Sequence, residues 1–216
     1  MSTNLKKPTQ ALRQLLLAVS LLAGGPRLAP AQAAADSIVY RLLPSSRFDV
    51  KTGKSGLFGF AGHSHVVRAR AFAGRVVYHP GDPSASRLEI TVRTDSLEVL
   101  TPPDTAEIRK VTETMRTEVL NVEQYPELRF ASRKVTPTPT GFQIVGDLTL
   151  VGQTREVSVD ATVEVGADTL RATGRFAVKQ SDFGIKPYSG GPGGTVKVAD
   201  RVAFEFEAVG VREAAP

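Results

Sequence analysis

Residues 141–165 read GFQIVGDLTLVGQTREVSVDATVEV, and this stretch decides the fold. Apolar residues alternate with polar ones on both sides of the Val151-Gly152 pair. The apolar set is Phe142, Ile144, Gly146, Leu148 and Leu150 before the pair and Val157, Val159, Ala161 and Val163 after it. An alternation of period two is typical of a strand with one apolar and one solvated face. So short a connection joins antiparallel strands, and the stretch therefore predicts a β-hairpin.

The same alternation recurs along most of the chain after residue 35. It predicts strands around residues 88–93, 128–131, 170–179 and 201–208, with two more at 38–43 and 66–79 and a weaker one at 47–51. Short segments rich in Gly, Pro, Asp and Ser separate these runs, which favours antiparallel neighbours. About eight such strands must hide their apolar faces and their edges, and a closed barrel hides both. The sequence therefore predicts an all-β fold, an antiparallel barrel of about eight strands.

One segment, residues 103–120, departs from the period of two. Its apolar residues recur at helical spacing and are Ile108, Val111, Met115 and Val119. This spacing is typical of one stripe of an amphipathic α-helix, and Asp104 and Glu107 have the spacing of a capping box. We expect one helix that covers an end or a side of the barrel.

Residues 1–35 have the three regions of a secretory signal peptide in order. A basic start is followed by a short apolar run at 15–23 and by a tract of small residues with cleavage choices at Ala31, Ala33 and Ala35. The apolar run is too short to span a bilayer, which needs about 20 residues. We expect export to the periplasm or beyond, with residues 36–216 as one barrel domain; a disordered N-terminal extension is the alternative.

Composition excludes several classes of function. The chain has no Cys, so it has no disulfide, no thiolate metal site and no Cys-linked lipid anchor. Segment 1–35 has four basic residues and no acidic one, so it supplies most of the formal charge of +5. The rest of the chain has 23 basic and 22 acidic residues, which nearly balance. A general affinity for nucleic acid is therefore not expected. Neither a Gly-x-Ser-x-Gly elbow nor a phosphate-binding loop occurs, and we expect no catalysis and no cofactor.

The barrel interior is the main candidate for a binding site. An eight-stranded barrel holds either a packed core or one small ligand. The inward-facing candidates are Phe72, Leu88, Ile90, Val92, Phe130, Phe142, Ile144, Leu148, Phe176, Phe204 and Phe206. Small residues on the same faces leave room among them, namely Ala161, Ala172, Gly174 and Ala208. A dry tube of this kind suits a long hydrocarbon, and an ordinary packed core is the alternative.

Two pairs of polar residues lie at or just before the start of the strand expected at 66–79. His63 and His65 lie two apart, which on a strand places both on one face and suits two ligands of one metal ion; a pair on the barrel rim is the alternative. Arg68 and Arg70 follow, and at a barrel mouth they would pair with a phosphate head group. A solvated strand face is the alternative for both arginines.

Several strings along the chain carry a resemblance. They are FAGRV at 72–76, DPSAS at 82–86, YPELRFAS at 125–132, GDLTLVGQT at 146–154 and SDFGI at 181–185. In this order they resemble the YceI-like family of periplasmic polyisoprenoid-binding proteins, from about residue 38 to 211. Gln180 stands where the family usually has Arg, and the family's commonest members lack the His-x-His at 63–65.

The resemblance implies an up-and-down, lipocalin-like antiparallel barrel with one helix and an elongated apolar pocket. It also implies binding of an isoprenoid chain without catalysis. We therefore expect an exported protein that sequesters or carries an isoprenoid or another long apolar lipid, with no stable membrane anchor. A homodimer is left open. The alternatives are a ligand-free interaction module and a metal-binding protein that uses His63 and His65.

Overall fold

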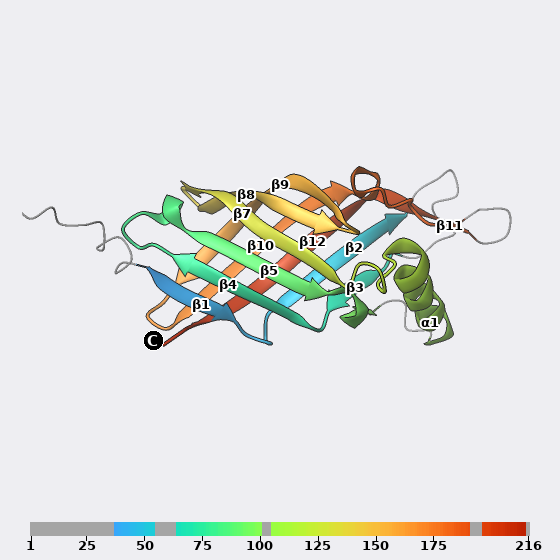
Figure 1. Ribbon diagram of the computed structural model, residues 1–216, viewed down its shortest axis with the longest axis horizontal. Coiled ribbons are helices and arrows are strands. Elements are labelled where there is room, and N and C mark those ends of the chain that lie inside the picture. The colour runs from blue at the N-terminus through green and yellow to red at the C-terminus, as the bar shows by residue number, and fades with distance from the viewer. Residues whose placement is uncertain (1–36, 55–63, 101–104, 191–195, 215–216) are drawn as a thin grey trace, which may run out of the picture.

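The computed structural model describes residues 37–54, 64–100, 105–190 and 196–214, and they form an antiparallel β-barrel with a helix at one end (Figure 1). The predicted signal segment therefore lies outside the described residues. The strands are β1 (Ile38–Leu42), β2 (Arg47–Lys54), β3 (Val66–Ala69), β4 (Phe72–Tyr78), β5 (Arg87–Arg93), β6 (Leu97–Val99), β7 (Glu127–Thr138), β8 (Gly141–Leu150), β9 (Gln153–Val165), β10 (Thr169–Lys179), β11 (Ser189–Gly190) and β12 (Val196–Arg212).

The barrel closes because β1 and β12 pair with each other. Neighbouring strands follow the order β1-β4-β5-β7-β8-β9-β10-β12, and β12 returns to β1 with Tyr40 opposite Arg212. All of these pairings are antiparallel. The fold prediction is confirmed: the chain is an eight-stranded, up-and-down, lipocalin-like barrel.

The strands β2, β3 and β6 extend the barrel wall toward the helix. The long strand β12 pairs with β1 near one end and with β2 farther along, where Phe206 lies opposite Phe48. β2 then pairs with β3, and β3 with β6. The single strand predicted at 66–79 is therefore wrong in one respect, because the chain bends at Arg70 and Ala71 between β3 and β4. There the Ala71 N–H donates to the Ser96 hydroxyl at 2.9 Å, which replaces a ladder hydrogen bond.

The stretch at residues 141–165 forms the predicted hairpin of β8 and β9. Leu150 lies opposite Gln153, and Val151 and Gly152 make the turn with φ of +42° and +74°. Two positive φ values in succession define a turn whose twist matches that of the flanking strands. A β-branched residue such as Val151 is strained at positive φ, so the pairing of the two strands holds it there.

The predicted helix is present as α1 (Thr105–Thr114), which continues into a π-helical turn at Met115–Val119. Figure 1 shows it beside β3 at one end of the barrel, called the helix end below. Ile108, Val111 and Met115 pack there against an apolar cluster of β3, β5 and β6. The residues of the capping box predicted from Asp104 and Glu107 lie outside the part whose side chains are described.

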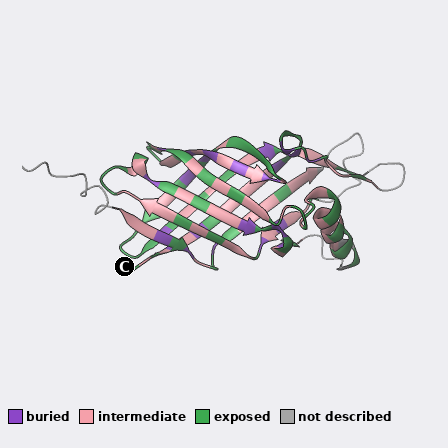
Figure 2. Cartoon of the chain, in the orientation of Figure 1, coloured by how far each residue is buried: buried purple, intermediate pink, exposed green. Residues whose placement is uncertain are grey.

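The wall alternates between exposed outer residues and inward residues that are less exposed, which Figure 2 shows as bands along the strands. At the end away from the helix, Tyr40 is fully buried and its hydroxyl donates to the Gly166 carbonyl at 3.3 Å. At the helix end, Phe183 is 1% exposed and packs among inward residues of β8, β10 and β12. A large buried side chain therefore lies near each end of the barrel.

Candidate functional site

The barrel encloses a cavity of about 180 Å³ whose wall is almost entirely carbon. Ten of the eleven apolar residues predicted to face inward line it: Leu88, Ile90, Val92, Phe130, Phe142, Ile144, Leu148, Phe176, Phe204 and Phe206. The eleventh, Phe72, is not among the lining residues. Its ring meets that of Phe48 edge-on, with 4.9 Å between ring centroids, in the apolar cluster under α1.

Other lining residues were missed by the sequence reasoning. They include Leu42, Phe48, Val50, Val67, Ala69, Val76, Leu97, Leu128, Val135 and Leu170. Most obey the same alternation, so the signal was present. The short segments β3 and β6 carry too few residues for a period of two to stand out, and β2 was expected only as a weaker strand. Three of the small residues expected to leave room, Ala161, Ala172 and Ala208, do line the cavity.

The buried hydroxyl at the cavity wall is hydrogen-bonded within the protein. Ser86 is buried, and its hydroxyl accepts a hydrogen bond from the His79 N–H at 3.1 Å. Beyond one end of the cavity, burial raises the pKa of the Tyr40 phenol above its usual value, which keeps the group neutral. The wall therefore offers a ligand apolar contact and little else.

Arg68 and Arg70 lie on the outer face of the barrel and are not among the cavity-lining residues. The Arg68 guanidinium donates twice to the Asp49 carboxylate, each time at 2.7 Å, and these hydrogen bonds raise the pKa of Arg68. The two side chains are only 25% and 12% exposed. Arg70 is more exposed and forms an ion pair with Glu98. Both arginines thus have acidic partners from neighbouring strands.

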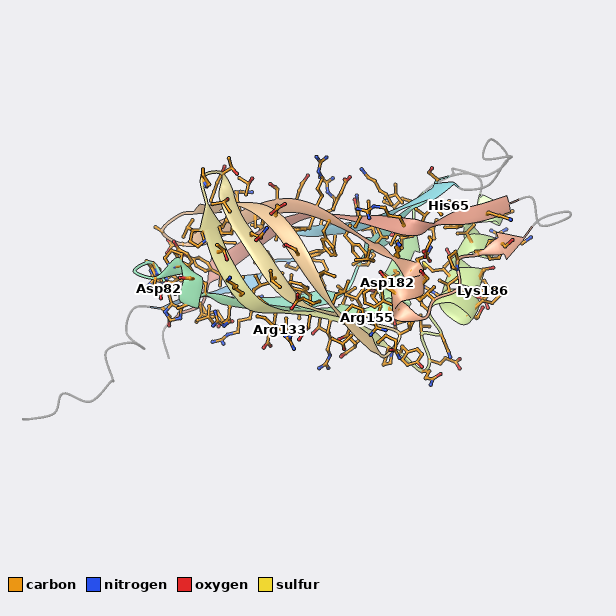
Figure 3. All side chains as sticks on the ribbon, turned by 90° about the horizontal axis from the view of Figure 1, so that it is seen from above. His65, Asp82, Arg133, Arg155, Asp182 and Lys186 are labelled. Carbon is orange, nitrogen blue, oxygen red and sulfur yellow. The ribbon has the colours of Figure 1, made fainter. Side chains whose placement is uncertain are left out.

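The structure tests the histidine pair only in part, because His63 lies outside the described residues. His65 lies at the helix end and Asp82 at the opposite end of the barrel (Figure 3). The His65 carbonyl accepts a hydrogen bond from the Thr52 N–H at 2.9 Å, which extends the pairing of β2 and β3. Within the described ranges, no three or more His, Cys, Asp or Glu side chains gather as a metal site would require.

Gln180, which stands where the family usually has Arg, has a structural role. It follows β10 in a short 3-10 helix (Gln180–Phe183), is 9% exposed, and donates through its side-chain amide to the Ala199 carbonyl at 2.9 Å. Ala199 lies where the pairing of β12 with β2 shifts register, between Val198 and Val202. Gln180 therefore satisfies a backbone carbonyl beside an irregularity in the wall.

A second hollow, of about 970 Å³, shares Phe142, Ala161 and Phe206 with the cavity but differs from it in chemistry. The rest of its lining is mostly charged residues and threonines, many of them on β2, β9, β10 and β12. Two of the cations are paired within the wall, Arg47 with Glu207 and Lys51 with Glu205. Because these charges already have partners, the enclosed apolar cavity is the stronger candidate site. No helix in the described ranges is long and apolar enough to cross a membrane.

Comparison with known proteins adds the family. Residues 45–210 match the model of the YceI-like domain. A UPF0312 protein of Shewanella baltica is 31% identical over 183 residues, which cover 81% of this chain and 88% of that protein. A UPF0312 protein of Serratia proteamaculans is 31% identical over 122 residues; the match covers 53% of this chain and only 59% of that protein's length.

Solved structures share the fold at low sequence identity. Burkholderia cenocepacia BcnA superposes with a TM-score of 0.62 at 19% identity, over 78% of this chain and 98% of that one. A domain from Saccharophagus degradans, described as polyisoprenoid-binding and implicated in plant cell wall breakdown, gives 0.55 at 11% identity, over 81% and 98%. The family match covers most of the chain, and these barrels have the same architecture. The chain belongs to the YceI-like family.

Proposed function

We propose that this protein binds an isoprenoid or a similar apolar lipid chain in the barrel cavity and carries or sequesters it without chemical change. The observation that supports this most directly is the cavity inside the barrel with its carbon wall. Such a wall gives a sugar or a nucleotide no replacement for the hydrogen bonds that it makes in water, whereas a hydrocarbon loses none. The description of the Saccharophagus degradans domain as polyisoprenoid-binding supports the same ligand class.

The cavity volume limits how much of a ligand enters without rearrangement. A cavity of about 150 Å³ in a packed protein core admits benzene, and the cavity here is about 180 Å³. About six buried carbons at ~0.8 kcal/mol each give ~5 kcal/mol, a Kd near 0.2 mM before the entropic cost of binding. Tighter binding of a long chain therefore requires inward side chains to move and bury more of it.

The protein would act in the periplasm or outside the cell, because residues 1–35 have the pattern of a signal peptide. A carrier of this kind shields the hydrocarbon from water between the sites where it is loaded and released. The ligand's polar group, if it has one, stays near a barrel end, since a carbon wall would strip its hydration without compensation.

The test is native mass spectrometry of the protein purified from its own periplasm, followed by organic extraction of bound material. We expect a co-purified apolar lipid that is released by solvent. Delipidated protein should then bind the fluorescent probe N-phenyl-1-naphthylamine, and the extracted lipid should displace it. A protein that carries no lipid and binds no apolar probe would be a filled barrel, and the interaction-module alternative would replace this proposal.

A further inference from the structure

At three inward-facing glycines of the barrel wall, the end of a larger side chain lies over the place of the missing Cβ. We call Gly74 of β4, Gly146 of β8 and Gly174 of β10 the glycine recesses. Leu42 covers the first, Phe130 the second and Phe206 the third. All three covering residues line the cavity. The recesses therefore concern the shape of the cavity itself.

The contacts at all three recesses are too close for any side chain to share the space, and at two of them the covering group is an aromatic ring. The Phe206 ring carbons Cζ and Cε1 lie 2.5 and 2.7 Å from the place of a Cβ on Gly174. The Phe130 ring carbons Cζ and Cε2 lie 2.6 and 2.9 Å from the place of a Cβ on Gly146. Carbon atoms normally approach to about 3.5–4.0 Å. Each ring thus occupies volume that an alanine would take from it.

The pairing of β10 with β12 shows what the recess does to the width of the interior. Phe176 lies opposite Phe204, and these two rings stack with 4.8 Å between centroids. In the next inward pair, Gly174 lies opposite Phe206, so one ring takes the place of two. The pair after that is Ala172 and Ala208, with no ring. Over these three pairs, the side chains on this wall therefore shrink stepwise away from the helix end.

We infer that Gly146 and Gly174 determine which apolar chains the cavity accepts, because they hold the Phe130 and Phe206 rings against the wall and out of the bore. The width gained in this way admits the methyl branches of an isoprenoid-type chain, whereas a narrower bore would admit a straight chain only. This inference rests on the proposed function and specifies its ligand class.

The test compares two saturated alcohols with the same main-chain length, hexahydrofarnesol with methyl branches and dodecanol without them. Their affinities for the delipidated full-chain protein are measured by displacement of N-phenyl-1-naphthylamine. Gly174→Ala pushes the Phe206 ring into the bore, and we expect it to weaken hexahydrofarnesol about tenfold or more and dodecanol far less. The double variant Gly174→Ala/Phe206→Leu should restore the wild-type ratio of the two affinities.

The double variant distinguishes an effect of the Phe206 ring on the width of the cavity from an effect on the backbone of the wall. A Cβ at position 174 also meets the Asp160 carbonyl oxygen at 2.7 Å, and this conflict is the same in the single and double variants. Only the ring conflict is removed by Phe206→Leu. The matched control is Gly53→Ala in β2, where a Cβ meets nothing closer than the Ala199 Cβ at 3.4 Å. It should change neither affinity.

Equal loss of both alcohols in Gly174→Ala, or no recovery of the ratio in the double variant, would overturn the inference and leave the proposed function standing. If Gly174→Ala does not fold, Phe206→Leu alone decides, since a widened bore must keep or raise the preference for the branched alcohol; a lower preference refutes the inference. If the wild-type protein binds neither alcohol nor the probe, the proposed function itself fails.

Discussion

Filling the cavity with a side chain should abolish ligand binding at little cost in stability, and Ala172→Phe is the suitable change. Ala172 lies on the inward face of β10 and lines the cavity. The new phenyl ring is the size of the benzene molecule that a cavity of about 150 Å³ admits, and about 180 Å³ is available here. Burial of the ring contributes up to ~2 kcal/mol, and residual overpacking costs ~1–3 kcal/mol. The net change in unfolding free energy should therefore lie within about 1 kcal/mol of zero.

The assay pairs urea unfolding with fluorescence titration of N-phenyl-1-naphthylamine. The control is Ala73→Phe, the same substitution at an exposed position on the outer face of β4, which should leave probe binding unchanged. Wild-type probe affinity in Ala172→Phe would refute the cavity as the binding site. A loss of stability above about 3 kcal/mol would show that the interior has no room for the ring and is packed.

Three further predictions concern the outer face of the barrel, one of its ends and the N-terminal segment. Arg68→Gln should cost about 1–2 kcal/mol in urea unfolding, because it leaves the largely buried Asp49 carboxylate without its partner, and it should not change probe binding; selective loss of a polyprenyl phosphate over a neutral isoprenoid would instead assign Arg68 to a head group. Tyr40→Phe should cost about 0.5–1.5 kcal/mol. Because the folded-state pKa of Tyr40 is raised, the stability that Tyr40 contributes should be fully present below pH ~10 and be lost as the pH rises above it. Melting temperatures measured at several pH values should therefore fall less in Tyr40→Phe than in the wild type. N-terminal sequencing of exported protein should begin between Gln32 and Asp36, and a start at Met1 would contradict the signal peptide.

The alternation of period two was enough to predict the barrel, because each wall residue faces either the cavity or solvent. The same alternation also indicates a bend, which the prediction of one strand at 66–79 overlooked. Val67 and Ala69 face inward at odd positions, whereas Phe72 and Gly74 face inward at even ones. An inward face cannot change parity within one regular strand, so a shift of phase marks a break. The break at Arg70 and Ala71 was therefore readable from the residues.

Other features of the site depend on contacts between residues far apart in the chain. The acidic partner of Arg68 is Asp49, and nothing local to either residue indicates the pair. The Tyr40 hydroxyl, near one end of the barrel, donates a hydrogen bond to the Gly166 carbonyl, which is 126 residues away. The glycine recesses are equally non-local, since a glycine in a strand reads as a weak point until the ring that covers it is known. Pattern alone therefore gives the wall of the cavity but not its ends or its bore.

The way β12 closes the barrel has a consequence for folding kinetics. This strand, the last along the chain, pairs with β10 on one side and with both β1 and β2 on the other. The first strands therefore keep an open edge until the final segment arrives, and contacts of such long sequence separation form slowly. Slow closure keeps the chain unfolded for longer, which is compatible with the proposed export. The same delay leaves β-strand edges exposed to other chains, so a holding chaperone should raise the yield of refolding.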